Sequence, residues 1–166
     1  LIGENTDGKG FLRSLTAITD PKGKTVVLFG AGGAARAVAV ELALAGVGQF
    51  ILVNRTPERG RQLLDTLIGK LDCRAELVQW QGDFALPSGT DIVINGTSIG
   101  LYDAEARLPL DTATLQPGQI VADVVFSPPV SRLLRDAAAR GCKTLDGLSM
   151  LVNQGVIGVA FWTGIT

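Results

Sequence analysis

The sequence contains no histidine and only two cysteines among its 166 residues. Histidine is the residue used most often for proton transfer near neutral pH and is the commonest metal ligand. Its absence excludes serine–histidine catalytic triads and histidine zinc sites, and no metal site is predicted. Cys73 and Cys142 lie far apart and form no CxxC pair. This spacing is typical of reduced cysteines that pack as small side chains, and it favours a cytoplasmic location.

The sequence also lacks an excess of charge of either sign and a long apolar run. Fifteen basic and sixteen acidic residues give a formal net charge of −1. Such a balance creates no global field that would attract nucleic acid or an anionic membrane. No run reaches the ~18 apolar residues that a membrane span needs. We therefore expect neither nucleic acid nor membrane as a partner, and any anionic ligand must be met by a local site.

Apolar runs and helical segments alternate along the chain. Hydrophobic residues make up 46% of the sequence, which is enough for one core at this length. Strands are predicted at 25–29, 50–53, 75–80, 91–95, 120–125 and 143–145, and helices at 34–45, 57–68, 131–140 and 148–162. Alternation of this kind predicts an α/β fold with a doubly wound, mainly parallel sheet and helices on both faces.

A glycine-rich turn lies between the first strand and the helix that follows it. The turn reads Gly30-Ala31-Gly32-Gly33-Ala34-Ala35-Arg36. A strand, this spacing and a helix in this order are typical of the dinucleotide site of a Rossmann-like fold. Gly30 permits the tight turn, Gly32 lets backbone amides approach a pyrophosphate, and Ala35 keeps the helix close to the sheet. The alternative is a tight turn whose small residues serve packing alone.

The end of the second strand indicates which dinucleotide binds. An acidic residue at this place holds the ribose of NAD, but here the chain reads Asn54-Arg55-Thr56-Pro57-Glu58-Arg59. A cation in the first turn of a helix is disfavoured by the helix dipole unless an anion lies nearby. A 2′-phosphate held by the guanidinium groups of Arg55 and Arg59 would be such an anion, so the pattern favours NADP. Alternatively, Arg59 is a surface residue paired with Glu58 or Asp65.

Four motifs together resemble those of the shikimate/quinate 5-dehydrogenase family. They are Asn5-Thr6-Asp7-Gly8, the turn at 30–36, Asn54-Arg55-Thr56, and Asp146-Gly147-Leu148-Ser149-Met150-Leu151-Val152-Asn153-Gln154. Two further segments look like family loops, and they are Asn95-Gly96-Thr97-Ser98-Ile99-Gly100 and Asp123-Val124-Val125-Phe126-Ser127-Pro128. The resemblance spans essentially the whole chain, but it covers only the family's NADP-binding domain and the junction that leads into it.

The resemblance implies a role for individual residues. Asp7 matches the family's catalytic aspartate, which works beside a lysine on another domain, and Lys9 is not in a position to replace that lysine. Asn5 and Gln154 match positions that bind the substrate. The positions that match residues near the cofactor's nicotinamide are Thr97, Ser98, Gly147 and Met150. Spacing alone favours another interpretation, in which the segment at 5–7 is a helix N-cap cluster and Gln154 binds a backbone group.

The resemblance also predicts the organisation of the protein. Residues 1–20 are expected to be a junction helix leading from an N-terminal substrate domain outside this chain. Residues 21–147 are expected to be the NADP-binding domain, and 148–166 a helix that returns toward the substrate site. The chain alone is expected to be inactive, and the oligomeric state, including a homodimer, stays open.

Two departures from the family pattern bear on the substrate. Phe126 replaces the usual tyrosine and removes a hydroxyl near the bound substrate, whereas Gly96 in place of alanine is expected to be minor. The expected activity is hydride transfer between NADP(H) and shikimate, quinate or a related cyclic hydroxy acid. The alternatives are a non-enzymatic NADPH-binding module and the cofactor domain of another NADP-dependent dehydrogenase.

Overall fold

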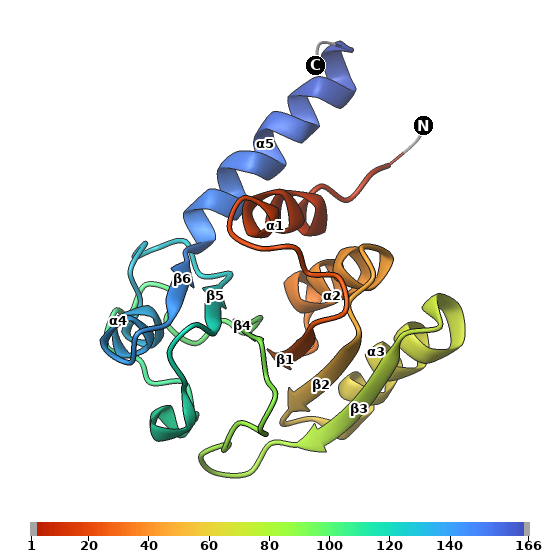
Figure 1. Cartoon of the computed structure of the whole chain (residues 1–166). Coiled ribbons are helices and arrows are strands. Elements are labelled where there is room, and N and C mark those ends of the chain that lie inside the picture. Colours follow the sequence, from red (N-terminus) through yellow and green to blue (C-terminus); the bar gives the residue numbers. More distant parts are fainter. Residues whose placement is uncertain (1–2, 165–166) are drawn as a thin grey trace.

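The computed structural model describes residues 3–164 and contains one parallel sheet. Its strands are β1 (Thr25–Phe29), β2 (Gln49–Asn54), β3 (Arg74–Gln79), β4 (Ile92–Asn95), β5 (Ile120–Asp123) and β6 (Lys143–Leu145). They lie in the order β3-β2-β1-β4-β5-β6 (Figure 1). The order reverses between β1 and β4, and sheets of this kind bind ligands in the crevice above that point. The predicted Rossmann-like, doubly wound fold is confirmed.

Helices precede β1 and follow β1, β2, β4, β5 and β6, whereas β3 leads to β4 without a helix between them. They are α1 (Asp7–Thr16), α2 (Gly33–Leu44), α3 (Pro57–Leu71), the short 3-10 helix η1 (Thr112–Thr114), α4 (Arg132–Ala139) and α5 (Gly147–Thr163). Helix α3 continues beyond the predicted end at residue 68, and Asp72 in a left-handed conformation follows its last turn. Strand β5 ends two residues earlier than predicted. The Asp123 side chain accepts the Val125 N–H at 2.9 Å, which turns the chain out of the strand.

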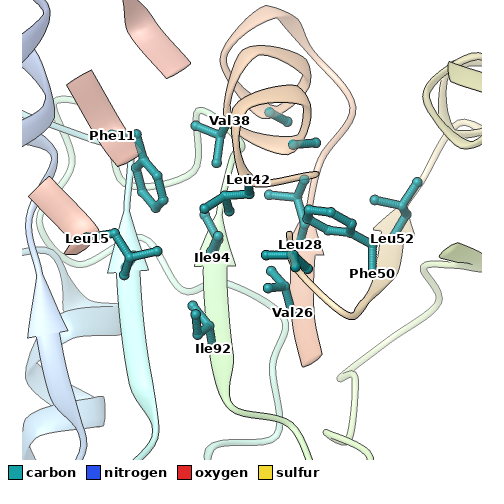
Figure 2. Close-up of a cluster of buried hydrophobic side chains, with 14 of the residues drawn as sticks. Phe11, Leu15, Val26, Leu28, Val38, Leu42, Phe50, Leu52, Ile92 and Ile94 are labelled. Carbon is teal, nitrogen blue, oxygen red and sulfur yellow. The ribbon is translucent and has the colours of Figure 1, made fainter. Parts of the chain in front are cut away.

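Side chains of the central strand β1 alternate between two cores, one on each face of the sheet. Val26 and Leu28 pack with residues of α1, α2 and α3, and Phe11 of α1 is among them (Figure 2). Val27 and Phe29 belong to the opposite core, which includes residues of α4. Burial on both faces explains why β1 is apolar throughout instead of alternating with polar residues.

Helix α1 lies against α2 on one side and α5 on the other, and glycines make both contacts close. A Cβ built on Gly8 would overlap the carbonyl oxygen of Ala37, and one built on Gly10 would lie 2.6 Å from the Gln154 nitrogen. Beyond α1, helix α5 extends away from the rest of the structure (Figure 1). Its exposed apolar side chains are Leu148, Leu151, Val152, Val156, Val159, Phe161 and Trp162.

The length of α5 and its apolar character raise the question of a membrane segment. Within residues 3–164, no helix combines the length and the apolar character that a bilayer crossing requires.

Candidate functional site

A groove of about 450 Å³ lies at the carboxyl ends of the central strands, above the point where the strand order reverses. Its walls come from the segments that follow β1, β2, β3, β4 and β5. The lining residues include Gly30, Ala31, Gly32, Gly33, Ala34, Asn54, Arg55, Thr56, Arg59, Gly96, Thr97, Ser98, Val125 and Phe126. The fold therefore brings the glycine-rich turn, the arginine segment and the loop at 97–98 to one site.

The glycine-rich turn leaves room for a ligand. Gly30 has a φ of +98°, which glycine tolerates, and its N–H donates to the Val53 carbonyl at 2.9 Å. No atom lies within 4 Å of a Cβ built on Gly32 or Gly33. The N–H groups of the first turn of α2, which begins there, have no carbonyl partner within the helix. Open space beside these N–H groups fits a pyrophosphate.

Two unpaired cations stand at the β2 side of the groove. Arg55 and Arg59 are exposed, and neither guanidinium has a hydrogen bond or an ion pair with any residue of the described range 3–164. The alternative pairing of Arg59 with Glu58 or Asp65 is therefore absent from this range. Asn54 fixes the loop because its side-chain Nδ2 donates to the Thr56 carbonyl at 2.7 Å. The arrangement offers two free guanidinium groups to an anion.

Arg36 is a residue whose role the sequence did not reveal, although it ends the glycine-rich motif. Its Nε donates to the Ala31 carbonyl at 3.2 Å, and its Nη2 donates to Gln62 Oε1 at 2.7 Å. The side chain therefore links the turn before α2 to helix α3. This link holds the arginine segment beside the glycine-rich turn.

The loop after β4 forms the other end of the groove, and Asn95 organises it. Asn95 Oδ1 accepts the Thr97 N–H at 3.1 Å and the Thr97 hydroxyl at 2.7 Å. Its Nδ2 donates to Oδ1 of Asp123, a buried carboxylate at the end of β5, at 3.0 Å. Burial raises the pKa of Asp123, and hydrogen bonds from Ser131, Val125 and Asn95 oppose that rise. The sequence placed Asn95 and Asp123 within motifs but indicated no role for either side chain.

Gly96 is required by packing, which corrects the expectation that its replacement of alanine is minor. A Cβ built on Gly96 would lie 2.8 Å from the Ala35 Cβ and 2.9 Å from the Phe29 carbonyl oxygen. Gly96 therefore lets the loop after β4 approach the start of α2. The same contact agrees with the prediction that Ala35 keeps this helix close to the sheet.

Two predicted nicotinamide-side residues do not line the groove. Met150 is 7% exposed and belongs to the main core. Gly147 begins α5, and a Cβ there would overlap the backbone of Val125, which does line the groove. Gly147 thus contacts the backbone of a groove-lining residue, whereas Met150 packs in the core, and its predicted place near the nicotinamide stays a prediction.

Asn5 and Gln154, the predicted substrate residues, each bond a residue at the start of α1, but not one another. The Thr6 hydroxyl donates to Gln154 Oε1 at 3.0 Å, and both residues line a second cavity of about 500 Å³ along α5. Asn5 Oδ1 accepts the Asp7 N–H at 2.9 Å, so Asn5 supplies the side-chain acceptor at the start of the helix. The Asp7 carboxylate is exposed and binds no residue within 3–164, so its side chain is not a cap there.

Lys9 is engaged elsewhere. Its Nζ lies 3.3 Å from carboxylate oxygens of both Glu4 and Glu41, and these partners raise the pKa of Lys9. Because both acids hold the ammonium, Lys9 is not available as the lysine that would work beside Asp7. The described range therefore holds an aspartate, an asparagine and a glutamine of the predicted substrate site.

Comparisons with known proteins agree with the fold and the motifs. Residues 14–100 match the family model described as shikimate / quinate 5-dehydrogenase. A shikimate dehydrogenase (NADP(+)) of Moorella thermoacetica is 46% identical over 99% of this chain and 57% of its own length.

Solved structures include a ligand-free 5-ketofructose reductase of Gluconobacter sp. strain CHM43. It is 55% identical with a TM-score of 0.97, over 100% of this chain and 60% of that one. A shikimate 5-dehydrogenase of Thermus thermophilus, in complex with NADP(H) and shikimate, is 37% identical with a TM-score of 0.77. The match covers 98% of this chain and 58% of the Thermus chain. The chain spans less than two thirds of the length of these relatives. It belongs to the shikimate/quinate 5-dehydrogenase family.

Proposed function

We propose that this chain is the NADP-binding part of an oxidoreductase that transfers a hydride between NADP(H) and shikimate, quinate or a related cyclic hydroxy acid. The observation that carries the proposal is the groove, in which an open glycine-rich turn faces two arginines without acidic partners in the described range. The names of the Moorella and Thermus relatives include NADP and shikimate, which supports the same assignment.

The cofactor's 2′-phosphate is assigned to Arg55 and Arg59. Their guanidinium groups carry charge without a compensating acid in the described range, and the N-terminus of α3 adds the positive end of its helix dipole. Among residues 3–164, no carboxylate lines the groove to bind the 2′-hydroxyl of NAD. Charge-assisted hydrogen bonds contribute ~1.5–3 kcal/mol each before desolvation is subtracted, so a tenfold to hundredfold preference for NADP is expected, at ~1.4 kcal/mol per decade.

Hydride transfer is assigned to the nicotinamide end of the groove, where the cofactor meets two sets of residues, one beside the nicotinamide and one beside the substrate. Bound NADP supplies the hydride acceptor, and the protein supplies orientation and a route for the proton. Thr97 and Ser98 are assigned to the nicotinamide side, together with Gly147. Asp7 is assigned as the acid–base group at the substrate hydroxyl. Asn5 and Gln154 are assigned to substrate binding.

The remaining part of the site is assigned to a substrate domain outside this chain. We place residues 1–20 at the junction, 21–147 in the NADP-binding domain and 148–166 in the returning helix. Helix α5 supports this division, because an apolar helix that leaves most of its surface uncovered needs a partner surface. The two cysteines, both free, agree with a cytoplasmic location.

A second substrate class is favoured by two observations. The 5-ketofructose reductase is 55% identical to this chain, and the groove carries Phe126 where the family has a tyrosine. A phenyl ring offers no hydroxyl to a cyclic acid. Reduction of an open or cyclised keto-sugar by NADPH is therefore the second candidate function, and it uses the same groove.

The cofactor assignment is tested by calorimetry on the 166-residue chain, which has its own core. The wild type is expected to bind NADP more tightly than NAD, and the Arg55→Ala/Arg59→Ala double variant is expected to lose that preference. Arg61→Ala is the matched control, because Arg61 lies on the same helix but does not line the groove. Equal affinity of the wild type for the two cofactors would overturn the assignment.

The substrate is tested with the full-length protein. Oxidation of shikimate or quinate by NADP and reduction of 5-ketofructose by NADPH are compared for the wild type and for Phe126→Tyr. Turnover of a cyclic acid supports the first candidate, and turnover of the keto-sugar alone supports the second. Tight NADPH binding without turnover of either class would favour a non-enzymatic module.

A further inference from the structure

We propose that the buried Asp123 carboxylate is a positioning residue that holds the two loops at the nicotinamide end of the groove, 96–98 after β4 and 124–126 after β5, in one arrangement. The inference rests on the proposed NADP site. It goes beyond that site because Asp123 does not line the groove and acts only through the residues that it binds.

The contacts of Asp123 reach three separate segments. The side chain is 1% exposed. Its Oδ1 accepts hydrogen bonds from Asn95 Nδ2 at 3.0 Å and from the Val125 N–H at 2.9 Å. Its Oδ2 accepts the Ser131 hydroxyl at 2.6 Å. Because every partner is a donor, the geometry fits the ionised carboxylate, which only accepts.

Asn95 connects Asp123 to the loop after β4 by hydrogen bonds to both. Its Oδ1 accepts both the N–H and the hydroxyl of Thr97, and its Nδ2 also donates to the Ile99 carbonyl at 3.1 Å. The Thr97 hydroxyl in turn accepts the Ile99 N–H at 3.0 Å. The loop at 96–99 is thus bonded to one side chain, and that side chain is bonded to Asp123.

Ser131 and Val125 fix the segment after β5. The Val125 N–H bond to Asp123 sets the turn that leads to Phe126, which lines the groove. Ser131 caps α4 by accepting the Leu134 N–H, so the hydroxyl ties Asp123 to the start of that helix. The segment from Val125 to Ser131 is therefore bonded to the Asp123 carboxylate at both of its ends.

The network is confined to one half of the groove. The glycine-rich turn and the arginine segment share no hydrogen bond with Asp123, Asn95 or Ser131 within the described residues. A buried carboxylate is costly for stability unless its hydrogen bonds repay the desolvation. Two of the three bonds hold loops that line the nicotinamide half, and the third fixes the start of α4, which follows the second loop. We infer that the benefit of these bonds is the geometry of that half.

The test uses two probes on the 166-residue chain. NADP occupies both halves of the groove, whereas adenosine 2′,5′-bisphosphate occupies only the half beside Arg55 and Arg59. Asp123→Asn keeps the shape of the side chain, but its amide cannot accept from all three donors. The variant is expected to bind NADP at least about tenfold more weakly, the size of one lost charge-assisted hydrogen bond, and to bind the bisphosphate within about twofold of wild type.

Ser131→Ala provides a second variant that breaks the Oδ2 bond from the other side. It is expected to weaken NADP more than the bisphosphate, in the same direction as Asp123→Asn. Arg59→Ala is the control for the opposite end and is expected to weaken both probes. Equal weakening of both probes in Asp123→Asn, or no change in either, would overturn the positioning role. Failure of the wild type to bind NADP would overturn the proposed function.

Discussion

The Thr6 hydroxyl donates a hydrogen bond to Gln154 Oε1 at 3.0 Å, although the two residues are 148 positions apart. This bond joins the start of α1 to the middle of α5. It fixes Asp7, the next residue, relative to Gln154. The close approach of the two helices at Gly10 makes the bond possible, because a side chain there would collide with the Gln154 backbone.

Asp7→Asn separates the acid–base role of this residue from a structural one. In the full-length protein, the substitution is expected to lower turnover by ~10²–10⁴-fold, the contribution of general acid–base catalysis. NADP affinity and thermal stability are expected to change little, since the Asp7 carboxylate binds no residue of the described range. Steady-state kinetics, calorimetry and thermal unfolding measure the three quantities.

Asn5→Ala is compared with Asp7→Asn for stability only, because Asn5 is itself assigned to substrate binding. It removes the acceptor of the Asp7 N–H and is expected to lower stability by ~0.5–2 kcal/mol, the cost of losing a helix cap. Unchanged turnover in Asp7→Asn would remove the acid–base assignment.

The isolated chain is expected to bind NADP without oxidising shikimate or quinate. Lys9 is held by Glu4 and Glu41, and the rest of the substrate site is assigned to another domain. Proximity and orientation contribute ~7–11 kcal/mol to such reactions, so half a site gives no measurable rate. Absorbance of NADPH at millimolar substrate is the measurement. Detectable NADPH from either acid would contradict the division of the site between two domains.

Gly96→Ala is expected to lose stability, whereas Gly32→Ala is expected to lose NADP affinity. The added methyl at 96 would press on Ala35 and the Phe29 carbonyl, so the variant is expected to unfold ~1–3 kcal/mol more easily, the range for overpacking. At Gly32 the backbone has φ −78° and ψ −171°, which any residue adopts, and the space is open.

Gly32→Ala is therefore expected to keep its stability and to lose NADP affinity, because the methyl occupies the space assigned to the pyrophosphate. Urea unfolding and calorimetry on both variants check the pair. A stable Gly96→Ala, or a Gly32→Ala with wild-type affinity, would show that the close contact or the open space has been misassigned.

The sequence predicted best where the signal is local. The strand, glycine-rich turn and first long helix lie next to one another in the chain, and their apolar runs and spacing identify them without tertiary information. The arginine segment is local in the same sense: an acid is absent, and two cations follow within a few residues.

The parts that escaped prediction depend on contacts between distant segments. Asn95 and Asp123 are 28 positions apart and meet only because β4 and β5 are neighbours in the sheet. Arg36 reaches Gln62 across 26 positions in the same way. The end of β5 was misjudged for a related reason, since a side-chain bond rather than an apolar pattern ends the strand.

The raised pKa of Asp123 predicts a pH signature of folding. Between the ordinary aspartate value of 3.8 and the raised value, the folded protein keeps a proton that the unfolded chain has already released. The contribution of this group to the free energy of unfolding therefore falls as pH rises through that window, and it stays constant above it. The difference in unfolding free energy between wild type and Asp123→Asn is expected to decrease across the same window, measured by urea unfolding at a series of pH values.

Asp83→Asn provides a control with the opposite sign. Arg107 lowers the pKa of Asp83, so the stabilisation from that pair is present above the ordinary aspartate value and is lost as pH falls through the lowered one. The pair is exposed, and its effect is expected to be small. Below the ordinary aspartate pKa, the unfolding free energy of wild type minus that of Asp83→Asn should rise with pH. Above the same pKa, the unfolding free energy of wild type minus that of Asp123→Asn should fall with pH. A flat or rising Asp123 difference would mean that the three donors outweigh burial and that this carboxylate is stabilised in its ionised form.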